Sequence, residues 1–421
     1  MNHLNLRLKT GEFFLPCDGA EYAAWACVAC DQFTSQPEYW TDVYRLVADK
    51  PSTAKLILPE CYLDEASQRI PAIHAEMKRC LAEGVVKPKV QNGFILTVRS
   101  TESGTRAGIV VLIDLEGYDY HAGSASLIRA TEGTILERIP PRVQVRRGAT
   151  LEMSHVLMLL DDPGKTVIEP VFEKRNDLPK VYDFPLMMGG GHVMGYAITG
   201  EADVQAVLTA LDGLLAKLPG ENPLLYAVGD GNHSLAAAKA CWEELKNSLS
   251  AVELEEHPAR YAMVELENIH DDALLFEPIH RMLFGCDGNA LLEDWRRHME
   301  AHGMRLSDSA QAHAITCVFG GGETAMRIEG SPQMLEVGTL QAFLDEWMAA
   351  HPNVRMDYVH GEESVRALAA QEGAVGFLLP KPDKQSLFAT VRREGVLPRK
   401  TFSMGEAHEK RYYLETRKLV K

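Results

Sequence analysis

The chain has 421 residues, of which 46% are hydrophobic and 24% charged, as is typical of a soluble globular protein. Its length predicts about two or three domains, and its formal charge of −16 argues against general binding to nucleic-acid backbones, which requires a basic surface. The first residues lack the apolar segment of a signal peptide, and no apolar run is long enough to cross a membrane. We therefore expect a cytoplasmic protein of several parts.

In the first 200 residues the pattern predicts one helix in an irregular region, followed by a strand-rich region. The helix covers 64–83 and ends at Gly84. Strand patterns follow, in chain order, at 93–100, 107–116, 155–160, 166–172 and 192–198. The first two strands flank a polar turn, which predicts a hairpin.

From residue 201 the pattern alternates between helices and strands. Helices are predicted at 202–217, 234–249, 289–302 and 338–350. Strands are predicted at 224–228, 260–266, 314–319, 354–359 and 374–379. Such alternation favours α/β packing with some parallel strand pairs. The predicted fold is a mixed α/β (α+β) protein, in which a β-rich region 1–200 packs on an α/β region 201–421, either as two domains or around one shared core.

Charge is distributed unevenly along the chain. The last thirty residues carry a net charge of +5, whereas the remainder carries −21. The segment is patterned like an ordered strand and helix, which favours a role in supplying cations to the protein's own cleft over a role in binding nucleic acid. We expect it to pack on the body of the protein, with Lys400 facing the main cleft.

Eight cysteines are scattered along the chain, and only Cys27 and Cys30 form a close pair. A structural zinc site needs about four ligands, usually from two clusters, and no second CxxC or CxxH motif accompanies this pair. Asp31 follows directly, and its negative charge opposes thiolate formation. We expect reduced cysteines and no structural zinc ion.

The sharpest local motif is Gly229-Asp230-Gly231, which joins the predicted strand at 224–228 to an alanine-rich helix capped by Asn232 or Ser234. The start of a helix presents free N–H groups and a positive dipole end, and glycines let a ligand approach the backbone closely. His233 would lie in the first turn, where the dipole favours a neutral imidazole that can act as a base or donor. The alternative is an ordinary tight turn.

A second motif combines several arginines with a single acid. Glu132 and the threonines Thr131 and Thr134 lie among five arginines: Arg129, Arg138, Arg142, Arg146 and Arg147. Guanidinium groups bind phosphate and carboxylate through paired donors, and one carboxylate among them could orient a hydroxyl group as a base. A solvated polar loop before the Ile-Pro-Pro turn explains the same pattern equally well.

His298 and His302 share one face of the helix predicted at 289–302. They do not form the zinc-protease motif, because Glu300 is not placed as that motif requires. Cationic side chains are favourable at a helix C-terminus, so the sequence favours a structural role for this pair.

Seven spaced segments together resemble a bacterial and archaeal protein family. They are CDQFTSQPEYW, LIRATEGTILERIPPR, LMMGGGHVMGY, GDGNHSLAAAK, EPIHRML, MDYVHG and LPRKTFSMGEAHEKRYYLE. They run from about residue 12 to 417 and resemble, in order, the family catalogued as domain of unknown function 1015. Common members of that family read roughly DGHHRYEA at the central segment, where this chain has Ser234 in place of the arginine.

The central segment is also similar to a motif of the ParB and sulfiredoxin superfamily, which includes an ADP-dependent free serine kinase. The resemblance implies a ParB-like strand–GDGNH–helix core in which Asp230, Gly231, Asn232 and His233 contact a nucleotide phosphate. It makes Glu132 a candidate base. Because the family's arginine is replaced at Ser234, the missing charge would come from another cation. The candidates are Arg129, Arg142, Arg281 and Lys400.

The leading hypothesis is a nucleotide-dependent phosphotransferase or phosphate-ester enzyme that acts on a small serine-like metabolite. Glu132 would orient the substrate hydroxyl, Asp230 would hold Mg²⁺ or a substrate amine, and His233 with the helix N–H groups would hold phosphate from ATP or ADP. The first alternative is a non-catalytic nucleotide- or DNA-linked regulator of ParB type. The second is a redox protein that uses Cys27 and Cys30.

Overall fold

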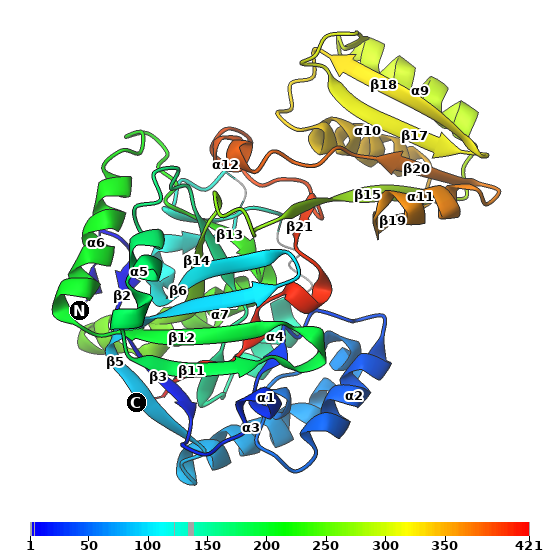
Figure 1. The fold of residues 1–421 in the computed structure, drawn as a ribbon. Helices are drawn as coiled ribbons and strands as arrows, with labels where there is room; N and C mark the ends of the chain where they lie inside the picture. The colour runs from blue at the N-terminus through cyan, green and yellow to red at the C-terminus, as the bar shows by residue number, and fades with distance from the viewer. Residues whose placement is uncertain (1, 4, 122, 134–138, 421) are drawn as a thin grey trace. The chain divides into compact units, whose positions relative to one another are not determined.

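The computed structural model describes residues 2–3, 5–121, 123–133 and 139–420 (Figure 1). The chain forms two compact units, one of Met1–Leu275 with Gly405–Lys421 and one of Phe276–Met404. The second unit is therefore an insertion in the chain of the first. The predicted boundary at residue 200 lies inside the first unit, between a strand and a helix that share one hydrophobic core.

The first unit is built on a mixed sheet of fourteen strands, with a separate pair formed by β4 and β22. Most strands pair antiparallel, but β10 with β14, β13 with β8 and β7 with β8 pair parallel. Each of these pairs includes a strand from before residue 200, so they do not arise from the strand–helix alternation after residue 201 on which the expectation rested. The strands of the unit are β1 (Asn2–His3), β2 (Leu8–Lys9), β3 (Gly11–Pro16), β4 (Cys27–Val28), β5 (Val86–Thr101), β6 (Gly104–Asp114), β7 (Tyr118–Asp119), β8 (Ile128–Ala130), β9 (Leu151–Met153), β10 (Leu157–Leu160), β11 (Lys180–Pro185), β12 (His192–Ile198), β13 (Tyr226–Asp230), β14 (Tyr261–Asn268), β22 (Tyr412–Tyr413) and β23 (Thr416–Lys418).

Helices cover both faces of this sheet. They are α1 (Tyr22–Trp25), α2 (Pro37–Val47), α3 (Ala66–Ala82), α4 (Ile139–Arg146), α5 (Glu169–Glu173), α6 (Glu201–Leu215), α7 (Asn232–Lys246) and α8 (Ala251–Glu256). Because successive side chains of a strand point to opposite faces, Ile95 packs with α1–α3 whereas Leu96 packs with α6 and α7. Both faces are apolar, so the strand-rich region and the α/β region share a core across one sheet.

Most of the predicted elements of this unit are present, and several of the differences involve proline. The segment 166–172 was expected to be a strand, but it contains the start of α5, with Pro170 in the first helical turn. Proline lacks the N–H that a sheet requires, and its fixed φ suits the start of a helix. The Ile-Pro-Pro sequence likewise begins α4, and Pro37 begins α2, neither of which was predicted.

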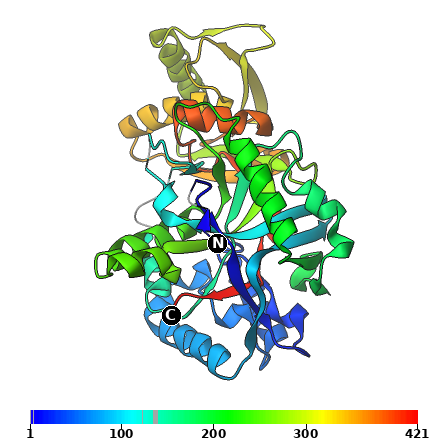
Figure 2. The same ribbon diagram turned by 90° about the vertical axis from the view of Figure 1, so that its left-hand side faces the viewer.

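The C-terminal segment belongs to the first unit from Gly405 onward. Its two strands pair with β4, β3 and β9, so the end of the chain lies among N-terminal elements, as the red strand in Figure 2 shows. The expected packing on the body is confirmed, although the expected helix is a single 3-10 turn, Ala407–Glu409. Arg411 and Arg417 are buried here against Glu265 and Glu152.

The second unit, Phe276–Met404, has its own sheet, in which all the pairs between described strands are antiparallel. Its strands are β15 (Phe276–Phe284), β16 (Arg305–Leu306), β17 (His313–Phe319), β18 (Gly322–Glu329), β19 (Arg355–His360), β20 (Ala374–Leu378) and β21 (Phe402–Met404). Its helices are α9 (Gly288–Ala301), α10 (Glu336–Ala350), α11 (Glu362–Ala369) and α12 (Leu387–Glu394). The parallel pairing is therefore confined to the first unit in the described part of the chain.

Candidate functional site

The predicted junction between a strand and a helix is present, where β13 ends at Asp230 and α7 begins at Asn232. Gly231 between them has φ +81°, a conformation that L side chains rarely adopt, and a Cβ there would lie 3.0 Å from Val156 Cα. The N-cap residue is this glycine, which has no side chain to occupy the N–H groups of the first turn. The glycine therefore shapes the junction and leaves the helix start open.

Glu132 and Asp230 lie at neighbouring strand ends. β8 and β13 run parallel, with Ile128 opposite Tyr226 and Ala130 opposite Val228. β8 ends at Ala130, two residues before Glu132, and Asp230 is the last residue of β13. Thr131 supports this arrangement, because its hydroxyl donates to the Val228 carbonyl at 2.6 Å.

Asp230 is held by two neighbours. Its Oδ1 accepts a hydrogen bond from the Gly231 N–H at 2.9 Å, and its Oδ2 lies 3.4 Å from Lys410 Nζ. The lysine side chain is 9% exposed and comes from the C-terminal segment. A cation from the basic C-terminal segment thus reaches the central motif, as expected. This cation is Lys410, whereas the sequence predicted Lys400.

A buried histidine links the start of α7 to the N-terminal region. His155 Nε2 lies 3.5 Å from Ser234 Oγ and 3.8 Å from Asp31 Oδ2, and its Nδ1 lies 2.6 Å from the Tyr413 hydroxyl. Asp31 is 26% exposed, so one carboxylate oxygen can face a ligand. We define the α7 site as Asp31, Glu132, His155, 230–234 and Lys410.

Electrostatics keep Asp31 ionised. Burial alone would raise its pKa, but His155, the amide of Gln32, Lys410 and Arg142 together hold the pKa of this carboxyl below its ordinary value. Burial raises the pKa of both Cys27 and Cys30 to about 12. Thiolates are therefore strongly disfavoured at this cysteine pair, which removes the chemical basis of the redox hypothesis.

The polar atoms of the helix start differ in their surroundings. The Asn232 side-chain oxygen is buried and finds no hydrogen-bond partner among the described residues. His233 is half-buried one residue further on. An unpartnered buried acceptor is uncommon in a folded protein, so Asn232 marks this helix start as a place where a donor belongs.

The other cations expected at the site have partners outside the central motif. Arg129 donates to backbone carbonyls of residues 124, 222 and 223, and Arg142 forms an ion pair with Glu60. Arg281 is fully buried in the second unit and donates to the carbonyls of residues 279, 399 and 400. Lys400 is exposed and also belongs to the second unit. Arg138 and Thr134 lie outside the described residues.

A largely apolar pocket adjoins the start of α7. Its empty volume is about 750 Å³ when the open solvent at its mouth is included, and Ser234 and Ala237 of α7 contribute to its wall. The remaining wall comes chiefly from α4 and from aliphatic residues of the N-terminal region, namely Leu56, Ile57, Leu58, Leu63, Met77, Pro141, Val145, Ala149 and Leu151. Its charged residues are matched in pairs, with Arg142 on Glu60 and Arg146 on Glu152. Such a pocket suits a flat or aliphatic group.

Sequence reasoning missed Asp31, His155 and Lys410. Asp31 was noted only as a charge beside the cysteines, and His155 was read as the first residue of a strand. Lys410 lies in the basic C-terminal segment, which was expected to supply a cation to the cleft. The signal that could have found this lysine is the aromatic pair Tyr412 and Tyr413, which follows closely and forms β22.

The family of the chain is shown by sequence comparison. The model of the family described as "Protein of unknown function (DUF1015)" matches residues 14–347, so the chain belongs to this family. No curated protein matches the chain significantly.

Solved structures show distant similarity. A variant of a free serine kinase in complex with AMP is 15% identical, covers 72% of this chain and 90% of its own, and has a TM-score of 0.40. A conserved hypothetical protein from Pyrococcus furiosus is 14% identical, with coverages of 74% and 95% and a TM-score of 0.35. A C-terminally truncated SbnI from Staphylococcus aureus is 10% identical, with coverages of 70% and 83% and a TM-score of 0.36.

Proposed function

We propose that this member of the DUF1015 family is a nucleotide-dependent phosphotransferase that acts on a small, serine-like hydroxyl compound. The observation that carries the proposal is a convergence at one end of β13. The open start of α7, two carboxylates at neighbouring strand ends, a buried lysine and an apolar pocket meet there. Each part matches one requirement of phosphoryl transfer.

The start of α7 supplies the phosphate position. Free N–H groups in the first turn and the positive end of a fifteen-residue helix favour an anion there. Lys410 adds a positive charge that would exchange Asp230 for phosphate, and His233 adds a donor in the first turn. This assignment gives Lys410 the part that the family's usual arginine would play beside Ser234.

The apolar pocket beside Ser234 suits the nucleoside. A base could pack against aliphatic side chains while its phosphates point to the helix start. Mg²⁺ prefers carboxylate oxygens, and Asp230 offers them at the end of β13. When bound, the ion would neutralise phosphate charge, and the ion pair of Asp230 with Lys410 would open to admit it.

The reaction assigned to this chain is a direct transfer. The acceptor hydroxyl oxygen forms a bond to the terminal phosphorus of the nucleotide, and the bond from that phosphorus to the bridging oxygen breaks. Glu132 accepts the hydroxyl proton, and the nucleotide leaves with one phosphate fewer. Asp31, ionised beside His155, is placed to hold an ammonium group of the acceptor.

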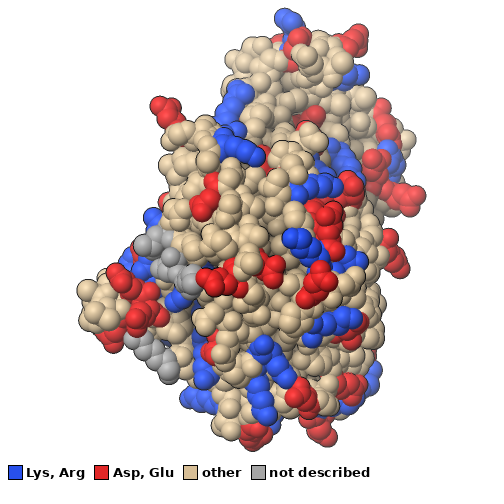
Figure 3. Space-filling view, turned by 60° about the vertical axis from the view of Figure 1, so that its left-hand side comes forward, with Lys and Arg blue, Asp and Glu red and all other residues tan. Residues whose placement is uncertain are grey.

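A non-catalytic nucleotide-binding regulator is the second candidate. It is favoured by the bonds of Arg129 to backbone carbonyls and by the ion pair of Arg142 with Glu60, which leave few cations to stabilise a transition state. Its DNA-linked form gains no support from the surface in Figure 3, where acidic and basic side chains are interspersed. Among the described residues, no helix is sufficiently long and apolar to span a bilayer.

Binding and turnover separate the two candidates. Thermal unfolding would be followed with ATP, ADP and phosphoserine, each with and without Mg²⁺, because a specific ligand raises the midpoint by mass action. ³¹P NMR with L-serine as acceptor would report transfer. Glu132→Gln should leave nucleotide affinity within a few-fold and lower turnover by ~10²–10⁴, the usual range for a general base.

Lys410→Met should weaken nucleotide binding. Lys246→Met, which changes a lysine at the C-terminal end of α7, should not. Binding without turnover in the wild type would favour the regulator. A wild-type protein that binds none of these compounds would contradict both candidates.

A further inference from the structure

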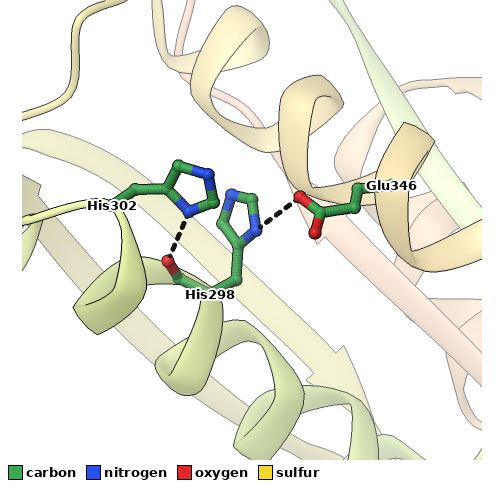
Figure 4. Close-up of side chains that lie close together, drawn as sticks. All are labelled: His298, His302 and Glu346. Carbon is green, nitrogen blue, oxygen red and sulfur yellow. Dashed lines mark hydrogen bonds and ion pairs between the residues drawn. The ribbon is translucent and has the colours of Figure 1, made fainter.

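Three side chains with metal-ligating atoms meet in the second unit, and none of them belongs to the α7 site. His298 and His302 lie one helical turn apart at the end of α9, and Glu346 faces them from α10, as Figure 4 shows. One potential ligand atom from each residue lies within 4.8 Å of the others. We propose that these residues bind a zinc ion that links α9 to α10.

The hydrogen bonds prepare His302 for this role. Its Nδ1 lies 2.8 Å from the His298 carbonyl oxygen, to which only a protonated Nδ1 can donate. The proton therefore occupies Nδ1, and Nε2 carries the lone pair. Backbone carbonyls hold the second nitrogen of metal-binding histidines in the same way, and this fixes both tautomer and ring orientation.

His298 is fixed more firmly than His302. Its side chain is 10% exposed, and its ring packs against Phe343 of α10 with centroids 5.4 Å apart. Its Nδ1 lies 3.2 Å from Glu346 Oε2. A cation that replaced the proton between these two atoms would gain one nitrogen and one oxygen ligand at once.

The distances fit zinc after a small movement. Zinc bonds of about 2.0–2.1 Å in tetrahedral geometry place the ligand atoms about 3.3 Å apart. The pair of His298 and Glu346 already has this spacing, and Glu346 is an exposed side chain that can rotate to close the remainder. Two imidazoles and one carboxylate form a recognised zinc ligand set that leaves a fourth position for water.

The ligand set also selects among cations. Magnesium and calcium prefer oxygen ligands, whereas imidazole suits zinc and its late transition-metal neighbours. This site is thus distinct in chemistry from the carboxylates of the α7 site. A bound ion would cross-link two helices that already meet through the stacked rings of Trp295 and Phe343 and through the hydrogen bond from Trp347 to Asp294.

The chain provides matched controls. His351 ends α10, and its Nδ1 lies 2.7 Å from the Trp347 carbonyl four residues earlier, as in His302. It is not among the residues with clustered ligand atoms. Glu300, exposed on α9, is the corresponding control for Glu346.

The test uses the full chain after treatment with a chelator. Isothermal titration with ZnCl₂ should detect one site, and Co²⁺ should give the intense visible bands of a four-coordinate ion. His302→Ala and Glu346→Gln should each weaken zinc binding by about tenfold or more, since second-shell losses alone reach that range. His351→Ala and Glu300→Gln should bind zinc as the wild type does.

Two results would overturn the proposal. One is the absence of zinc binding in the wild type up to about 1 mM, the weak limit of specific association. The other is wild-type affinity in His302→Ala, which would place the ion elsewhere on the chain. Because His302 is exposed, this variant should fold normally, and circular dichroism of each variant checks that it does.

Discussion

The α7 site and the pair of His298 and His302 are assembled in different ways. The α7 site is built from residues 31, 132, 155, 230–234 and 410, whose segments are joined by the pairing of strands distant in the sequence. The histidine pair lies within one helical turn, and a neighbouring helix adds the third side chain. The first region thus depends on buried long-range contacts, and the second on exposed local ones.

This contrast predicts where a substitution unfolds the protein and where it changes only binding. Around the C-terminal segment, charges are buried and paired, so the loss of one partner leaves an uncompensated charge in the core. At the end of α9, solvent can replace a lost partner. The four predictions below test this difference, from the largest expected effect to the smallest.

Arg411→Met should give the largest effect. The guanidinium lies 2.5 Å from Glu265 and 2.8 Å from Glu415, and all three side chains are buried. Removal of one partner of a buried ion pair costs about 3–5 kcal/mol. Urea unfolding should therefore show a much lower midpoint than the wild type, whereas Lys418→Met, on the exposed side of β23, should change little. Equal midpoints would mean that the tail contributes no buried charge.

Glu267 predicts a pH dependence of stability. Burial, against the attraction of Arg106, raises its pKa from 4.5 to about 7. The folded state therefore binds the proton more tightly than the unfolded state, and the stability that this provides is complete below about pH 4.5 and is lost as pH rises through about 7.

Glu267→Gln, which mimics the protonated acid, should remove this dependence. Between pH 4.5 and 8, the free energy of unfolding of the variant should rise relative to that of the wild type by on the order of 3 kcal/mol, as 1.36 kcal/mol per pKa unit implies. Urea unfolding at both pH values measures the change, and Glu255→Gln, for an exposed acid, is the control. A gap that does not grow with pH would show that Glu267 stays ionised.

Gly231→Val tests the junction itself. The left-handed φ strains any L side chain, and the new Cβ would also meet Val156. Gly123 has a similar φ of +79° with no atom within 4 Å of a Cβ, so Gly123→Val reports the strain alone. We expect a loss of about 1–3 kcal/mol for residue 231 and less for residue 123 in thermal unfolding. Equal losses of stability in the two variants would mean that the close contact between residue 231 and the Val156 backbone is unimportant.

The local parts of the architecture could be predicted from the sequence. The strand, glycine and helix of the α7 site follow from a buried apolar run, a flexible residue and a 3.6-residue pattern, all within 25 residues. Asp31, His155 and Lys410 could not be predicted as partners, because their proximity depends on β22 pairing with β4 and β10 pairing with β13. Glu346 could not be predicted as a partner of His298 and His302 for the same reason, since nothing in the sequence of α9 specifies which face of α10 packs against α9.

The smallest effect is expected for His302→Ala without metal. The side chain is exposed at the C-cap of α9, and its hydrogen bond to the His298 carbonyl can be replaced by water. Surface substitutions of this kind usually change stability by less than about 0.5 kcal/mol. Thermal unfolding in EDTA should thus give nearly the wild-type midpoint, whereas added ZnCl₂ should raise the wild-type midpoint and not that of the variant. A much lower unfolding midpoint for the variant in EDTA would instead make His302 a structural residue. The contrast between buried contacts at the α7 site and exposed contacts at the end of α9 would then be wrong.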